Sequence, residues 1–143
     1  MPVISEGEAL MTIAVAWDNE KKTIIRYEFQ KGWSWDEVDP AFKIADGLMS
    51  SVDHKVDVIM DFSPSSLLVP KGALTHAQRA LSNPRHDNLA STVIVGSRFV
   101  QAITDLARKV ARKSNDEWDL MFTVTLAEAY SVLENRASKG KAN

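Results

Sequence analysis

The sequence predicts a single α/β domain. We expect a five-stranded, mostly parallel sheet with an antiparallel edge strand at its N-terminal side and helices mainly on one face. Five segments alternate apolar and other residues with period 2, and four segments carry apolar residues at helical spacing. Their order is ββαβαβαβα. Strands that alternate with helices pair in parallel through right-handed crossovers, whereas two directly consecutive strands form an antiparallel hairpin.

The first two predicted strands form that hairpin. Period-2 alternation covers 11–17 and 24–29, and the five residues between them, 18–22, suit a short hairpin loop. Because the second strand leads into a helix, the first strand is expected at the edge of the sheet.

A helix is predicted over 38–52, where apolar residues recur at spacings of four and three. Ser34 and Glu37 have the spacing of a capping box at its start. Pro40 removes one backbone hydrogen bond if it lies inside a helix, so Asp39 is an alternative cap. We expect either a short first turn or a kink at this point.

Three strand–helix units complete the domain. Their strands are predicted at 56–62, 92–96 and 120–124. The second of the three helices has Ser97 as its cap, and Thr125 with Glu128 forms a capping box for the third. The helix that follows the strand at 56–62 carries the apolar residues Leu74, Ala77 and Leu81.

The two faces of the predicted sheet differ in polarity. We assign to one face the apolar residues Met11, Ile13, Val15, Trp17, Ile25, Tyr27, Phe29, Val56, Val58, Met60, Phe62, Val93, Val95, Leu120, Phe122 and Val124. The other face mixes Ile24, Ile59, Ile94 and Met121 with polar residues such as Asp57. Since a sheet covered on both faces has continuous apolar strands, most helices are expected on the first face. The mixed face or the edge strand is then expected to form a homodimer.

Composition narrows the function classes. The 143 residues are 45% hydrophobic, and 17 Lys and Arg stand against 19 Asp and Glu. This balance lacks the basic excess of nucleic-acid-binding proteins. The chain has no cysteine, which excludes disulfides and thiol catalysis. It also lacks an apolar run of membrane-spanning length and a signal peptide. We expect a cytoplasmic protein with a domain at 11–136 between tails at 1–10 and 137–143, and with neither nucleic acid nor membrane as partner.

Sequence motifs of catalysis and metal binding are absent. His54, His76 and His86 lie in separate segments without a second ligand at metal spacing. The chain has no phosphate-binding loop and no nucleophile elbow. We therefore expect no metal, no cofactor and no enzymatic activity.

The segment after the third strand carries a family resemblance. It reads Asp61-Phe62-Ser63, and Gly72 stands at the start of the next helix. Together with the element order, this resembles the STAS domain, named for sulfate transporters and anti-sigma-factor antagonists. The resemblance covers most of the chain and implies regulation through protein–protein contacts. The family's phosphoacceptor serine has no counterpart, because Pro70 and Lys71 occupy those positions. We therefore expect no phosphorylation switch at this helix start.

The same loop is the first candidate site, with Ser63, Ser65, Ser66, Lys71 and Gly72 as its residues. It follows the carboxyl end of a central strand, where α/β sheets place ligands, and a helix N-terminus beside a lysine suits an anion. The alternative is that the serines only shape a turn.

The second candidate is a basic docking patch on the following helix, formed by Arg98, Arg108, Lys109 and Arg112. Such a patch suits an acidic partner. Cations near the C-terminal end of a helix are also favoured by its dipole without any partner.

Two functions remain open: a non-enzymatic regulatory or protein-interaction domain, and a module that binds an anionic or lipid-like small molecule. A dry apolar pocket with a few polar groups beneath the loop favours the small molecule, and a flat exposed apolar patch favours the protein partner. Contact of Trp35 with the loop would support either kind of site.

Overall fold

A computed structural model describes residues 12–65, 71–82, 86–115 and 119–142. The sheet has the order β1-β2-β3-β4-β5, with β1 antiparallel to β2 and all other neighbours parallel. Its strands are β1 (Ile13–Trp17), β2 (Ile24–Phe29), β3 (Val56–Asp61), β4 (Leu89–Val95) and β5 (Asp119–Thr123). The predicted fold class is confirmed, including the antiparallel strand at the edge.

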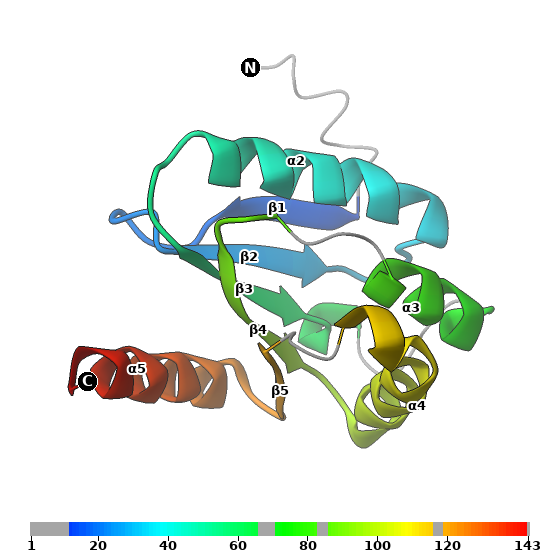
Figure 1. Ribbon diagram of the computed structural model, residues 1–143. Coiled ribbons are helices and arrows are strands. Elements are labelled where there is room, and N and C mark those ends of the chain that lie inside the picture. The colour runs from blue at the N-terminus through cyan, green and yellow to red at the C-terminus, as the bar shows by residue number, and fades with distance from the viewer. Residues whose placement is uncertain (1–11, 66–70, 83–85, 116–118, 143) are drawn as a thin grey trace, which may run out of the picture.

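Four α-helices and two short 3-10 helices connect the strands. They are η1 (Trp35–Glu37), α2 (Val38–Ser50), η2 (Ser63–Ser65), α3 (Ala73–Ser82), α4 (Arg98–Asn115) and α5 (Leu126–Ala142). Three α-helices, α2, α3 and α4, lie on one face of the sheet and α5 lies on the other (Figure 1). The prediction that helices lie mainly on one face is therefore confirmed, while α5 covers part of the opposite face.

The predicted helix starts agree with the structure. The carboxylate of Glu37 accepts a hydrogen bond from the backbone N–H of Ser34 at 3.1 Å, so the predicted capping box is present at the start of η1. Pro40 is the third residue of α2, which begins directly after η1. Glu37 also accepts hydrogen bonds from the backbone N–H and the hydroxyl of Thr12, at 2.5 and 2.7 Å. One capping residue therefore joins the start of α2 to the beginning of the edge strand.

The last two helices are capped as expected. The hydroxyl of Ser97 accepts from the backbone N–H of Val100 at 3.3 Å, and that of Thr125 accepts from the backbone N–H of Glu128 at 3.1 Å. The last helix is longer than expected, because α5 continues through most of the predicted tail to Ala142. That segment contains mostly residues that tolerate a helix and no proline, so nothing local ends it.

The face assigned to β4 from the sequence is wrong. Ile94 is opposite Met60 and Phe122, and it packs under α4, whereas Val93 and Val95 pack against α5. The cause is an irregularity at the start of the β3–β4 pairing, where one residue of β3, Asp57, stands against two of β4, Ala90 and Ser91. An extra residue of this kind moves every later side chain of the strand to the other face.

This correction removes the basis of the expected association face. Ile59 and Ile94 point to opposite sides of the sheet and both are buried within one chain. Ile24 and Met121 pack beside α5. These four residues therefore do not form one exposed surface, and a homodimer through the edge strand stays a prediction.

Candidate ligand-binding cavity

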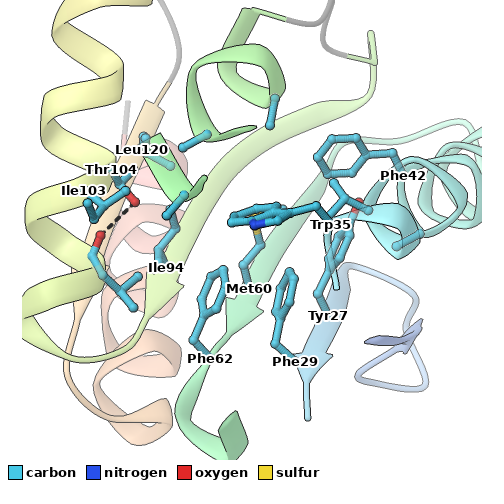
Figure 2. A pocket seen from close by; sticks show the side chains of 16 residues that line it. Tyr27, Phe29, Trp35, Phe42, Met60, Phe62, Ile94, Ile103, Thr104 and Leu120 are labelled. Atoms are coloured by element: carbon cyan, nitrogen blue, oxygen red, sulfur yellow. Dashed lines mark hydrogen bonds between the residues drawn. The ribbon is translucent and has the colours of Figure 1, made fainter. Parts of the chain in front are cut away.

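An apolar cavity of about 100 Å³ lies between α2, α3, α4 and the sheet (Figure 2). Its walls are formed by Tyr27, Phe29, Trp35, Val38, Ala41, Phe42, Met60, Phe62, Ala73, Ala77, Ala80, Ile94, Val100, Ile103, Thr104 and Leu120. Nearly all of these side chains are hydrocarbon. The lining of the cavity is therefore almost entirely apolar.

Small residues on α3 explain why this space stays open. Ala73, Ala77 and Ala80 are the residues of α3 that line the cavity, and their spacing of four and three places them on one helical face. Each contributes only a methyl group, so α3 leaves a gap above the sheet. The three alanines at helical spacing are visible in the sequence, but of the apolar residues that predict this helix, Leu74, Ala77 and Leu81, only Ala77 lines the cavity.

Aromatic rings form the opposite part of the wall. The rings of Phe29 and Phe62 stack with centroids 4.0 Å apart, and Tyr27 meets Phe42 edge to face at 6.0 Å. Behind them Trp33 packs edge to face on Phe29 at 5.0 Å. These contacts connect β2, β3 and α2, which gives this side of the cavity a fixed shape.

Trp35 and α3 form the outer wall of the cavity. The indole N–H of Trp35 donates to the backbone carbonyl of Lys71 at 2.8 Å, and its ring stacks on His76 with centroids 4.8 Å apart. An ion pair of 3.0 Å between Asp39 and Arg79 joins α2 to α3 on the outside. A smaller hollow of about 20 Å³ lies outside this wall, against the same Trp35 and His76. Trp35 is half-buried and contacts Lys71, at the end of the predicted loop, while residues 66–70 lie outside the described ones.

The polar groups of the cavity are uncharged. Burial raises the pKa of Tyr27 well above its ordinary value, with a further rise from the charge of Asp46, so its hydroxyl stays protonated. Thr104 is 8% exposed, and its hydroxyl donates to the backbone carbonyl of Val100 at 2.9 Å. Neither group can act as an acid or base near neutral pH.

The two described serines of the predicted loop, Ser63 and Ser65, make hydrogen bonds within their own turn. Ser63 donates from its hydroxyl and its backbone N–H to Asp61, at 2.6 and 2.9 Å, and the buried Ser65 donates to the carbonyl of Phe62. This agrees with the turn alternative for both serines. Ser66 lies outside the described residues.

Lys71 and Gly72 mark the start of α3. Gly72 has a φ of +82° and accepts the first hydrogen bond of the helix from the backbone N–H of His76, while Lys71 is exposed. A positive φ is strained for residues with a side chain, which explains the glycine at this position. Gly72 thus sets the start of α3, and the next residue, Ala73, lines the cavity.

The predicted basic patch is described only in part. Arg98 and Lys109 are exposed, and their separation of eleven residues places them on one face of α4. The side chains of Arg108 and Arg112 lie outside the described ones. Phe99 and Leu106, 52% and 48% exposed, add an apolar stripe to the outer side of this helix.

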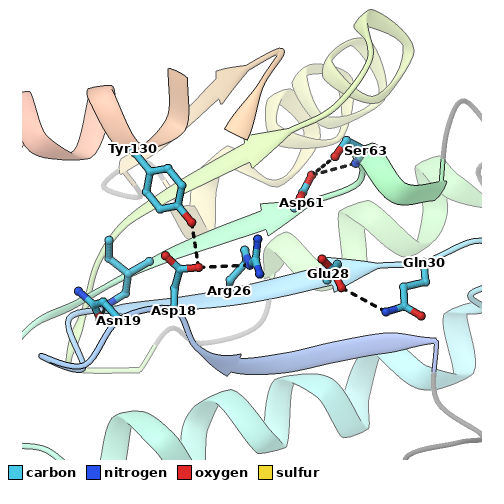
Figure 3. A network of polar contacts seen from close by, with 9 residues as sticks. Asp18, Asn19, Arg26, Glu28, Gln30, Asp61, Ser63 and Tyr130 are labelled. Carbon is cyan, nitrogen blue, oxygen red and sulfur yellow. Dashed lines mark hydrogen bonds and ion pairs between the residues drawn. The ribbon is translucent and has the colours of Figure 1, made fainter. Parts of the chain in front are cut away.

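A polar network on the other face of the sheet fastens α5 to the hairpin (Figure 3). Asp18 accepts from the hydroxyl of Tyr130 at 2.9 Å and pairs with Arg26 at 3.3 Å. Burial, and then the hydrogen bond to Asp18, raise the pKa of Tyr130 to about 12. The hydroxyl of Tyr130 therefore stays protonated near neutral pH and donates its hydrogen bond to Asp18. The network holds α5 against the β1–β2 hairpin.

The three histidines lie apart, with His76 on Trp35, His86 against Ser50 at 3.0 Å, and His54 near the carbonyl of its neighbour Lys55. Within the described ranges, His, Asp and Glu side chains form no cluster of three suited to a metal ion.

None of the helices in the described ranges is long and apolar enough to cross a membrane.

No protein-family model, curated protein or solved structure matches this chain. The resemblance to the STAS domain therefore remains one of element order and of the short motif at Asp61.

Proposed function

We propose that this protein is a non-enzymatic binding module for a small apolar molecule, held between the sheet and α3. The observation that carries the proposal is the apolar cavity of about 100 Å³ beneath the start of α3. Ligand-binding sites in proteins are commonly concave and mostly apolar, with a small number of polar groups.

The free-energy cost of leaving the cavity unfilled supports the proposal that the cavity has a function. An unfilled space in a core destabilises a protein by about 24 cal/mol per Å³, which for 100 Å³ is about 2.4 kcal/mol. One larger side chain on α3, in place of Ala77, would remove much of this cost. Natural proteins accept such a loss of stability where activity depends on it.

Binding of benzene, measured by calorimetry, tests the proposal. Unmodified protein is expected to bind it, and Ala77→Leu is expected to abolish binding because the larger side chain occupies the same space. Ala127→Leu is the matched control: the same change at an exposed position of α5. Absence of benzene binding to the unmodified protein, or binding retained in Ala77→Leu, would contradict the proposal.

The exposed stripe of Phe99 and Leu106 favours a second function, the regulatory protein contact that the STAS resemblance implies. The two residues are two turns apart on one side of α4, with the cations Arg98 and Lys109 nearby. The test is self-association by analytical ultracentrifugation. A dimer weakened at least tenfold by Phe99→Ser, but not by Ala127→Ser, supports this contact, and a monomer at millimolar concentration excludes a second copy as the partner.

A further inference from the structure

The cavity is built for a part of a ligand that carries no charge. None of its sixteen described lining residues is Asp, Glu, Lys, Arg or His. An ionised group placed there would lose its hydration without gaining a counter-ion, at a cost of several kcal/mol. A carboxylate or an ammonium group is thus excluded from the interior.

Size and wall shape restrict the ligand further. An engineered apolar cavity of about 150 Å³ holds benzene, so a space of about 100 Å³ admits a single ring at most. The stacked pair of Phe29 and Phe62 and the crossed pair of Tyr27 and Phe42 present flat faces and ring edges. Aromatic partners add about 0.5–1.5 kcal/mol beyond the area they bury.

Thr104 supplies one directional polar contact. It lies on the α4 side of the cavity, and Figure 2 shows its hydroxyl bonded to the carbonyl of Val100. That bond uses the single hydroxyl proton and leaves two lone pairs on the oxygen. Since these lone pairs have no partner among the described residues, the buried oxygen is an acceptor for a donor on the ligand.

We propose that the cavity binds an uncharged, single-ring aromatic molecule that carries a hydrogen-bond donor, as phenol does, with Thr104 as the acceptor. The inference rests on the proposed function and adds the ligand class and the residue that orients it. The ring lies against Phe29 and Phe62, and the donor points toward α4.

Four probes of similar size test the three requirements: phenol, benzene without the donor, cyclohexanol without aromaticity, and benzoate with a charge. Calorimetry on the full chain is expected to show phenol binding about three- to tenfold more tightly than benzene, the range of one neutral hydrogen bond. Cyclohexanol is expected to bind at least threefold more weakly than phenol, and benzoate more than a hundredfold more weakly.

Two substitutions at Thr104 identify the acceptor. Thr104→Val keeps the shape and removes the hydroxyl, so phenol is expected to fall to the affinity of benzene while benzene binding is unchanged. Thr104→Ser keeps the hydroxyl and is expected to retain the preference for phenol. Melting temperatures of both variants without ligand show whether the fold is intact.

The outcomes separate the two proposals. Equal binding of phenol and cyclohexanol overturns the aromatic requirement, tight binding of benzoate overturns the neutral interior, and an unchanged phenol affinity in Thr104→Val overturns the acceptor. Each of these leaves a small-molecule module in place. If benzene and phenol both fail to bind the unmodified protein, the proposed function itself is wrong.

Discussion

Replacing Ala77 by leucine is expected to stabilise the protein in the absence of ligand. Ala77 lies on the inner face of α3, and the new side chain extends into the cavity of about 100 Å³. Three additional buried carbons contribute about 0.8 kcal/mol each, about 2.4 kcal/mol in all. The cavity volume gives a similar upper figure by the cost per Å³ of unfilled space.

The net gain is expected to be smaller, about 1–2 kcal/mol. Fixing a leucine side chain costs about 0.5–1 kcal/mol of conformational entropy, and the fit to Phe62 and Ile94 will be imperfect. For a chain of 143 residues, this gain raises the melting temperature by about 3–7 °C. Most substitutions in a core are destabilising, so even a small gain is diagnostic of unfilled space.

Urea unfolding followed by circular dichroism measures the change, with Ala127→Leu as the control at an exposed helical position. The control is expected to stay within about 0.5 kcal/mol of the unmodified protein. A loss of more than 1 kcal/mol in Ala77→Leu, with an intact control, would refute the reasoning. It would mean that α3 already packs closely on the sheet and that the cavity is not available to a ligand.

Three further substitutions test the supports of the site. Glu37→Ala removes the acceptor of five hydrogen bonds, two of them from Thr12, and is expected to cost about 2 kcal/mol of unfolding free energy at pH 7. Although burial alone would raise the pKa of Glu37, the hydrogen bonds from Thr12 and its neighbours lower it. Its contribution is therefore present above the unfolded-state pKa and is lost as the pH falls through the folded-state pKa, so the difference in stability between the two proteins should begin to narrow as the pH falls below about 4.3. A difference that is as large at pH 2.5 as at pH 7 would contradict this. Gly72→Ala places a Cβ 3.2 Å from the ring of His76, at a backbone φ of +82° that strains residues with a side chain. It is expected to lower the free energy of unfolding, measured in urea, by about 1–2 kcal/mol. An unchanged urea midpoint would show that this turn relaxes without strain. Thr125→Ala removes the N-cap of α5 and is expected to cost about 1 kcal/mol, with faster hydrogen exchange confined to α5; exchange that speeds up equally in α2 would point to a global effect.

Local rules in the sequence determined the strands, their order and the ends of the helices. Period-2 alternation located β1 and β2, and the pairs Ser34 with Glu37 and Thr125 with Glu128 marked two helix starts. Such signals act within a few residues, between backbone groups and side chains that are neighbours along the chain. The same signals assigned the hairpin and, through the alternation of elements, the parallel sheet.

The tertiary structure alone decided which face each residue of β4 occupies. Thr92 to Val95 are all buried, so alternation carries no information about which side faces α5. One extra residue in the pairing with β3 then moves Ile94 to the side of α4 and Val95 to the side of α5. Register depends on contacts between strands that are about thirty residues apart, which no local pattern records.

The cavity is likewise a property of the assembled layers. The sequence contains the three alanines of α3 and the rings of Phe29 and Phe62, but a stripe of alanines at helical spacing is equally compatible with close packing on a neighbouring helix. The open space arises because α3 packs beside α4 at a distance from the sheet that its alanines do not fill. That distance is set by the packing of several elements at once, and so it exists only in the folded protein.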